Sequence, residues 1–279
     1  MFCRRSSGIN RALGPFFAVF SLFPMPAESG GQEAMTDWAE FSLPLAYDQG
    51  WISGPGAEWI LEHAPESQFI LFGEQHGIDG IPQIVAAMYG ALYDDGFHYY
   101  ATEIGPWIAH RLSESSVDEV AARYPHSITF DFDPELDLYR TVEDRFNAEG
   151  QRVWGLDQSS TAIHFLQRLV EIAPNHRARR LARGAFFKAV LKAGEYSRQD
   201  HQKDLDVLRE AFGDEAPDEA IQILNALEIS KDIFVAHRAA QGGEIPFSIS
   251  IEARESYMMA QLDEYLASGW PDRPRGIHR

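Results

Sequence analysis

Cysteine is almost absent from this chain, whose single thiol, Cys3, lies near the N-terminus of 279 residues. Cys3 falls within a segment that the sequence predicts to be a cleaved signal peptide, so the mature protein would hold no thiol. This excludes disulfides, thiolate nucleophiles and zinc sites built from cysteine. A protein without cysteine is compatible with an oxidising or a reducing compartment, so this absence does not decide the localisation.

Positive charge is also scarce, because 24 Lys and Arg stand against 42 Asp and Glu and give a formal net charge of −18. A field of this sign repels polyanions, so no nucleic-acid partner is expected. The chain also lacks a Gly-x-Ser-x-Gly elbow, which argues against the ordinary serine mechanism of α/β-hydrolases. The expected partner is a small-molecule substrate.

The N-terminal apolar run, residues 12–25, is shorter than the ~20 residues that a spanning helix needs. It follows Arg4, Arg5 and Arg11 and precedes Ala27-Glu28-Ser29, which places small residues at both cleavage-specificity positions. Residues 1–29 therefore predict a secretory signal peptide, no permanent membrane span, and a periplasmic or secreted protein. If this segment is not a signal, the protein is expected to be cytoplasmic.

Residues 30–279 predict a single α/β domain. Short apolar or aromatic runs alternate with segments of helical periodicity, which favours right-handed crossovers and a parallel sheet flanked by helices. The predicted strands are 69–72, 97–102 and 152–155, and the predicted helices between and after them are 81–92, 106–112 and 136–146.

Residues from about 160 to 243 show no strand pattern. Four helices are predicted there, at 162–172, 177–192, 202–212 and 218–240, followed by an extended piece at 245–251 and a helix at 252–267. The sequence thus predicts a helical insertion, which is either a lid over a pocket or a packed layer that completes the core.

An acidic residue follows each of the three predicted strands: Glu74, Glu103 and Asp157. Ligands of parallel sheets bind beyond the carboxyl ends of the strands, so these acids are expected to lie at one site. His76 is two residues from Glu74, and residues two apart on an extended backbone point to the same side. Gly73 and Gly77 flank the pair and allow close approach of a substrate or another backbone segment.

This set of residues supports two kinds of chemistry. A histidine held between carboxylates is suited to act as a general base that takes a proton from water. The same imidazole and carboxylates can instead hold a divalent metal, with Glu74, His76 and Glu103 as candidate ligands and Mn²⁺, Mg²⁺ or Ca²⁺ favoured by the oxygen donors. The residues alone do not choose between them.

The chain resembles the erythromycin esterase-like proteins, whose wider superfamily includes the ChaN-like haem-binding lipoproteins and the Tiki metalloproteases. Four ordered motifs between Phe69 and Leu266 carry this resemblance: Phe72-Gly73-Glu74-Gln75-His76-Gly77, Thr102-Glu103-Ile104-Gly105, Gly155-Leu156-Asp157 and Arg254-Glu255-Ser256-Tyr257-Met258-Met259-Ala260.

The resemblance implies a hydrolase that cleaves an ester or related acyl bond with water activated by His76. It makes Glu74 and Glu103 carboxylates that orient His76 or bind metal, and it places Asp157 in the same pocket. Arg254 would reach the carboxylates or stabilise a developing oxyanion, because a guanidinium is always charged and donates in a fixed fork.

The resemblance also leaves alternatives open. In the esterase-like family a strand with a second histidine motif follows the helix of Arg254, whereas residues 269–279 here contain two prolines and no apolar run. A truncated, inactive member is therefore one alternative. Another is a non-catalytic, ChaN-like envelope protein that binds haem or a metal.

A basic run of four arginines lies in the predicted helical insertion: Arg177, Arg179, Arg180 and Arg183. The run is short and the protein is acidic, so we interpret it as a solvated helix face rather than an anion site.

Overall fold

The protein folds into two compact units in a computed structural model of the chain. The first unit comprises Met1–Ala101 and Phe132–Arg152, and the second comprises Thr102–Asp131 and Val153–Arg279. The structure describes residues 2–4, 17–19, 42–48, 50–73, 78, 80–128, 132–145, 152–159, 161–192 and 194–267. Helices account for most of these residues and strands for fewer, which agrees with α/β content in the coarse sense.

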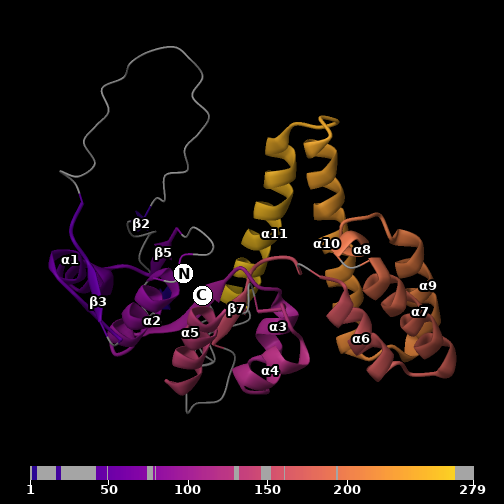
Figure 1. The fold of residues 1–279 in the computed structure, drawn as a ribbon, viewed down its shortest axis with the longest axis horizontal. Helices are drawn as coiled ribbons and strands as arrows, with labels where there is room; N and C mark the ends of the chain where they lie inside the picture. Colours follow the sequence, from indigo (N-terminus) through magenta and orange to yellow (C-terminus); the bar gives the residue numbers. More distant parts are fainter. Residues whose placement is uncertain are drawn as a thin grey trace, which may run out of the picture. The chain divides into compact units, whose positions relative to one another are not determined.

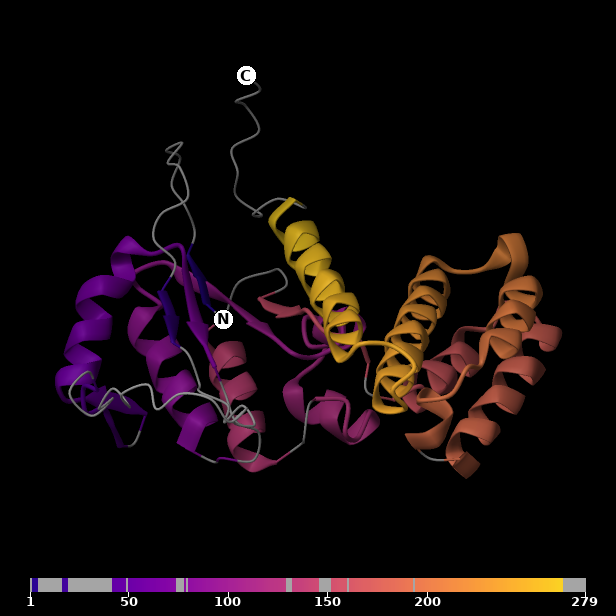
Figure 2. The same ribbon diagram turned by 90° about the horizontal axis from the view of Figure 1, so that it is seen from above.

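The strands of the first unit form a mixed rather than a purely parallel arrangement (Figure 2). β1 (Phe2–Arg4) pairs antiparallel with both β5 (Phe69–Phe72) and β6 (Phe97–Thr102), and β2 (Phe17–Val19) pairs parallel with β5. Because β1 is antiparallel to both neighbours, β5 and β6 run in the same direction but do not pair with each other. The parallel sheet that the sequence predicts is therefore seen only in part: β2 and β5 pair in parallel, whereas the N-terminal strand β1 lies antiparallel between β5 and β6.

The predicted signal peptide covers β1 and β2, while residue 1, residues 5–16 and residues 20–41 lie outside the described residues. The signal peptide and the localisation that follows from it stay predictions. An exposed hairpin, β3 (Ala46–Asp48) with β4 (Trp51–Ser53), precedes α1 (Pro55–His63) and the short 3₁₀ turn η2 (Ala64–Glu66).

Helices α2 (Gly80–Leu92) and α5 (Asp133–Asp144) pack against each other in the first unit (Figure 1). Of the apolar stripe predicted for residues 81–92, Val85, Met88 and Leu92 are buried, the last two with no exposed surface, and the remaining two isoleucines are half-buried. Tyr139 of α5 meets Tyr100 of β6 edge to face, with ring centroids 5.8 Å apart. Burial of these large apolar side chains is what holds the helices on the strands.

The second unit contains one strand and most of the helices. β7 (Val153–Gly155) lies here with two short helices, α3 (Pro106–Arg111) and α4 (Val117–Arg123). The remaining helices are α6 (Ile163–Ile172), α7 (His176–Lys192), α8 (Gly194–Ser197), α9 (Gln202–Phe212), η3 (Gly213–Glu215), α10 (Asp218–Gln241) and α11 (Phe247–Ala267). Within the described part of residues 160–243 there is no strand, and the four predicted helices form close to their predicted limits.

The predicted extended piece at 245–251 is wrong, because α11 begins at Phe247. Phe247, Ile249 and Ile251 alternate with polar residues as in a strand, but all three are exposed and no strand partner is described for them. Packing against α10 decides the local structure instead, and the two long helices run as an antiparallel pair (Figure 1). The Ser250 hydroxyl donates to the carbonyl of Phe247 at 2.8 Å inside the first turn.

Trp107 fixes α3 within the second unit. Its ring packs against Tyr124 at 5.0 Å and Phe165 at 5.1 Å, and its Nε1 donates to Glu219 Oε1 at 3.2 Å. Arg168 makes a two-pronged bond to the same carboxylate, at 3.0 and 2.8 Å. Burial acts against ionisation of Glu219, but the hydrogen bonds from Arg168 and Trp107 outweigh it and lower the pKa of this carboxyl. α3, α6 and α10 are thereby tied together.

His201 is a buried imidazole at the start of α9. Its ring stacks on Tyr196 with centroids 4.7 Å apart, Nδ1 lies 2.9 Å from the carbonyl of Gln199, and no partner is described for Nε2. Burial lowers the pKa of His201 below its usual 6.5. The folded state therefore favours the neutral ring.

The burial of His201 predicts that the protein loses stability as the pH is lowered. As the pH falls below 6.5 the unfolded chain takes up the His201 proton first, so the free energy of unfolding falls until the pH passes the lower folded-state pKa. His201→Asn keeps a donor for Gln199 but cannot titrate, so its loss between pH 7 and about pH 5 should be smaller. Urea unfolding at both pH values measures this, with the exposed His110→Asn as control. Equal losses in wild type and His201→Asn would contradict the prediction.

No helix in the described ranges is both long and apolar enough to cross a bilayer.

Candidate functional site

The structure brings together three of the residues predicted to form the site. Glu103, Asp157 and Arg254 lie in one hydrogen-bonded cluster in the second unit. Gly73 follows β5 and is exposed. Glu74, His76 and Gly77 lie outside the described residues, so their predicted places at the site are not tested.

Backbone hydrogen bonds set the two acids side by side. The N–H of Leu156 donates to the carbonyl of Thr102 at 3.0 Å, and the N–H of Asp157 donates to the carbonyl of Ile104 at 3.1 Å. The segments that follow β6 and β7 are therefore hydrogen-bonded to each other where Glu103 and Asp157 occur. Two carboxylates that are 54 positions apart in the sequence become neighbours by this pairing.

One glycine, Gly155, is required for this close approach. A Cβ on Gly155 would lie 2.6 Å from the carbonyl oxygen of Gly105 and 2.7 Å from that of Ile104, both of them backbone atoms. Real side chains are not tolerated at such distances. Glycine is thus required at position 155 because the two backbone segments lie so close together, and not because of an unusual backbone conformation.

Arg254 on α11 holds both acids in a fork. Its Nε donates to Asp157 Oδ1 at 3.0 Å, and its Nη2 donates to Asp157 Oδ2 at 2.6 Å and to Glu103 Oε2 at 2.8 Å. A planar guanidinium matches a carboxylate in this two-pronged geometry, which makes charge-assisted bonds of the stronger kind. The hydrogen bonds to Asp157 raise the pKa of Arg254 above its usual value, so the group stays charged.

The three side chains differ in burial, and this divides their roles. The Asp157 side chain is 12% exposed, whereas those of Arg254 and Glu103 are 38% and 43% exposed. The N–H of Gln158 also donates to Asp157 Oδ1, at 2.8 Å. Asp157 is therefore the buried anchor of the cluster, while one edge of Arg254 and one oxygen of Glu103 remain open to a ligand.

Tyr257 is a further residue of this region, and the sequence did not point to it as a site residue. It lies three positions after Arg254, the spacing that places two side chains on one helix face. Burial raises the pKa of Tyr257, and the nearby Tyr265 and Asp157 act in the same sense. Its phenol therefore stays protonated and can donate a hydrogen bond. The i, i+3 spacing from Arg254 was the available signal.

Tyr265 and Gln158 complete the surroundings of Asp157. Tyr265 stacks flat on Trp154, with ring centroids 5.3 Å apart and planes 2° apart, and its hydroxyl accepts the N–H of Gly155 at 3.3 Å. The side-chain oxygen of Gln158 is buried, and no partner is described for it. α11 is thus joined to β7 by Tyr265 and to Asp157, just beyond β7, by Arg254.

The metal prediction rests on Glu74, His76 and Glu103, of which only Glu103 is described. Its Oε2 already accepts the bond from Arg254. In the described part of the chain no group of three His, Cys, Asp or Glu side chains is placed to hold an ion. The described residues therefore supply at most one of the three candidate ligands.

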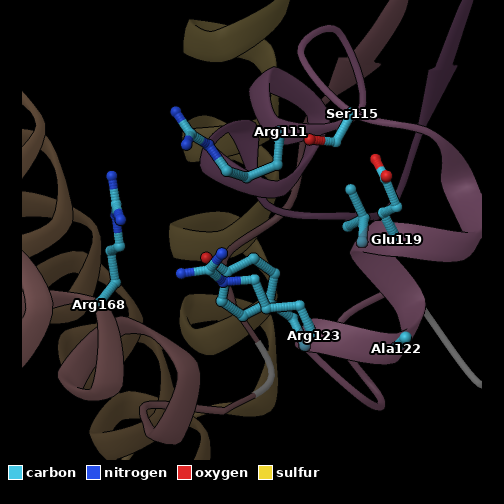
Figure 3. Close-up of a pocket in the computed structure, with 8 residues that line it drawn as sticks. Arg111, Ser115, Glu119, Ala122, Arg123 and Arg168 are labelled. Atoms are coloured by element: carbon cyan, nitrogen blue, oxygen red, sulfur yellow. The ribbon is translucent and has the colours of Figure 1, made fainter.

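A separate pocket of about 580 Å³ lies between α3, α4 and α6, lined by Arg111, Ser115, Glu119, Val120, Ala122, Arg123, Tyr124 and Arg168 (Figure 3). Its arginines are balanced by carboxylates. Arg111 pairs with Glu114 at 2.6 Å, Arg123 with Glu171 at 2.7 Å, and Arg168 with Glu171 and Glu219 at 3.0 and 2.8 Å. This network neutralises the pocket and is better suited to holding the helices than to binding an anion.

Comparison with known proteins identifies no relative, since no protein-family model, curated protein or solved structure matches this chain.

Proposed function

We propose that the protein is a hydrolase of the erythromycin esterase-like type, which cleaves an ester or related acyl bond by direct attack of water. In this proposal His76 is the general base, and Glu74, Glu103, Asp157 and Arg254 are the other residues of the site. The proposal includes the fold that the sequence predicts, a parallel sheet flanked by helices. Because β5 and β6 run in the same direction, their carboxyl ends lie on the same side of that sheet.

The observation that supports this proposal most is the fork of Arg254 on Asp157 and Glu103. Residues from three distant motifs of the resemblance meet there, although nothing in their local sequence requires contact. A surface ion pair would join two exposed groups, whereas Asp157 is largely buried. The cost of burying a carboxylate is offset by the charged fork, an arrangement that is common where a site must hold charges in fixed places.

The chemistry proceeds without a covalent intermediate. His76 takes a proton from water, and the water oxygen bonds to the acyl carbon to give a tetrahedral oxyanion. Arg254 Nη1, for which no bond is described, supplies donors to that oxyanion. The bond to the alcohol oxygen then breaks, and His76 returns its proton to the leaving alkoxide.

Glu74, His76 and Glu103 are the residues that would hold a divalent cation, whose contribution would be to polarise the ester carbonyl or acidify the attacking water. Asp157 and Arg254 would have the same role with or without the cation. Arg254 holds Glu103 in place, because its Nη2 donates to one oxygen of Glu103, and Asp157 in turn holds Arg254.

Hydrolysis of a panel of small esters and a macrolide lactone tests the proposal. The chain should release acid above the uncatalysed rate, and the folded His76→Ala variant should lose about a hundredfold in turnover, the contribution of a modest general base. Loss of turnover on adding a chelator would show that the cation is required. The matched control is His110→Ala, since His110 is exposed and paired with Glu114 on the surface of α3.

The hydrolase proposal fails if the folded wild type and His76→Ala release acid at the same rate in every buffer, with and without added Mn²⁺ or Mg²⁺. The same samples would then be titrated with haem, and a new visible absorption band would support the binding-protein alternative.

A further inference from the structure

Helix α7 is the most basic segment of the described chain. Its sequence from His176 to Lys192 contains six Lys and Arg and no Asp or Glu, in a protein whose net charge is −18. The basic residues are Arg177, Arg179, Arg180, Arg183, Lys188 and Lys192. The concentration of positive charge in one helix of an acidic protein needs a physical explanation.

Only one face of α7 is used for packing. Ala178, Ala182, Ala185 and Ala189 are buried and recur at helical spacing, and α7 packs on α6 and α9 (Figure 1). Small side chains at these positions let the helices approach closely. Leu181 and Phe186 are half-buried, and the opposite side of α7 is exposed to solvent.

The exposed face combines cations with large apolar groups. Arg180, Arg183, Phe187 and Leu191 follow one another at spacings of three and four, so they share one side of the helix. Phe187 is 56% exposed, Val190 45% and Leu191 86%. Single exposed apolar residues are common, but three within two turns of one helix form a patch.

The arginines of this face are not neutralised by the protein. Arg177 pairs with Glu210 and Lys188 with Asp204, each at 2.6 Å. For Arg179, Arg180 and Arg183 the structure describes no hydrogen bond or ion pair with any other described residue. Three full positive charges therefore stand beside Phe187 and Leu191 and face outward.

We propose that this face of α7, formed by Arg179, Arg180, Arg183, Phe187, Val190 and Leu191, binds an anionic lipid surface, in place of the merely solvated face that the sequence predicted for its arginines. The arginines match the negative headgroups, and Phe187 and Leu191 enter the boundary between headgroups and acyl chains. A nucleic acid would have no use for the apolar residues, and the remaining negative charge of the protein would repel it. An acidic protein surface would pair with the arginines but would gain little from a leucine that is almost fully exposed.

Flotation with lipid vesicles tests this proposal on the full chain. The protein should float with vesicles of phosphatidylcholine and phosphatidylglycerol in equal parts and stay in solution with vesicles of phosphatidylcholine alone. Arg180→Gln combined with Arg183→Gln should weaken the partition coefficient roughly 25-fold, about fivefold for each charge. Leu191→Ser should weaken it about tenfold, because a large apolar side chain is removed from the interface.

Two matched controls distinguish binding by this face from nonspecific adsorption of the protein to vesicles. Ile221→Ser removes another exposed apolar side chain, 44% exposed on α10, and Arg238→Gln removes an exposed arginine that is paired with Glu195. Both should leave flotation unchanged. All four substituted proteins change exposed residues, and circular dichroism should show them folded.

The proposal is overturned if the wild type fails to float with anionic vesicles, or floats equally well with neutral ones. It is also overturned if the α7 variants float as the wild type does. Retention on immobilised polyglutamate without vesicle binding would assign the face to an acidic protein. Loss of a dimer in Leu191→Ser, again without vesicle binding, would assign it to a second copy of the chain.

Discussion

Arg254→Ala is expected to lower the free energy of unfolding by about 2–4 kcal/mol, because it leaves the buried carboxylate of Asp157 without its charged partner. Asp157, whose side chain is 12% exposed, would keep only the N–H of Gln158 as a described partner. A fully buried pair would cost more, but the 38% exposure of Arg254 allows water to replace part of the lost fork. Glu103 contributes less, since it is the most exposed of the three.

Urea unfolding followed by circular dichroism measures this loss as a lower midpoint with an unchanged slope. Arg254→Lys should recover only part of it, because an ammonium group cannot make the fork to both oxygens of Asp157. Adding Asp157→Asn to Arg254→Ala should also recover part of it, since the unpaired charge is then removed.

The matched control for Arg254→Ala is Arg238→Ala. Arg238 pairs with Glu195 at 3.2 Å, and both side chains are more than half exposed. Such a pair contributes at most about 1 kcal/mol. If Arg254→Ala costs no more than Arg238→Ala, the cluster is an ordinary surface contact and the main support for the proposed site is lost.

Local patterns predicted the elements that carry their own signal. The run Phe69–Phe72, the stripe of α2 and the helices α6, α7, α9 and α10 form where periodicity placed them. β1 was not predicted, because its partners lie more than 60 residues away and no periodicity can be read from three residues. The alternation at 247–251 was misread as extended, because packing on α10 outweighs a local period of two.

The candidate site was predictable in part for a similar reason. Glu103 and Asp157 follow strands, so their approach could be expected from the rule that binding residues gather at strand ends. Arg254 lies on a helix 97 residues beyond Asp157, and only the resemblance suggested their contact. Tyr257 offered only its i, i+3 spacing from Arg254 as a signal, and Tyr265 offered none, because an aromatic residue on an amphipathic helix has the same appearance whether it lines a site or a core.

Gly155→Ala is the second substitution with a large expected effect, at about 3 kcal/mol of lost stability. The added methyl group, whose position is fixed by the backbone of residue 155, would lie 2.6 Å from the backbone carbonyl oxygen of Gly105. Neither can turn away as a flexible side chain would, so β7 must move. Since Asp157 is two residues on, the fork of Arg254 should be disturbed as well.

Gly184→Ala is the control of opposite sign, because nothing lies within 4 Å of a Cβ at this exposed position in α7. Alanine is favoured over glycine inside a helix by roughly 0.5–1 kcal/mol, so this variant should be slightly more stable than the wild type. Urea midpoints of both variants test the pair of expectations. Near-ultraviolet circular dichroism should change for Gly155→Ala alone, because Trp154 and Tyr265 stack beside the disturbed strand. A Gly155→Ala protein with the stability and spectrum of the wild type would mean that β7 and Gly105 are not in close contact, and the placement of Asp157 beside Glu103 would lose its basis.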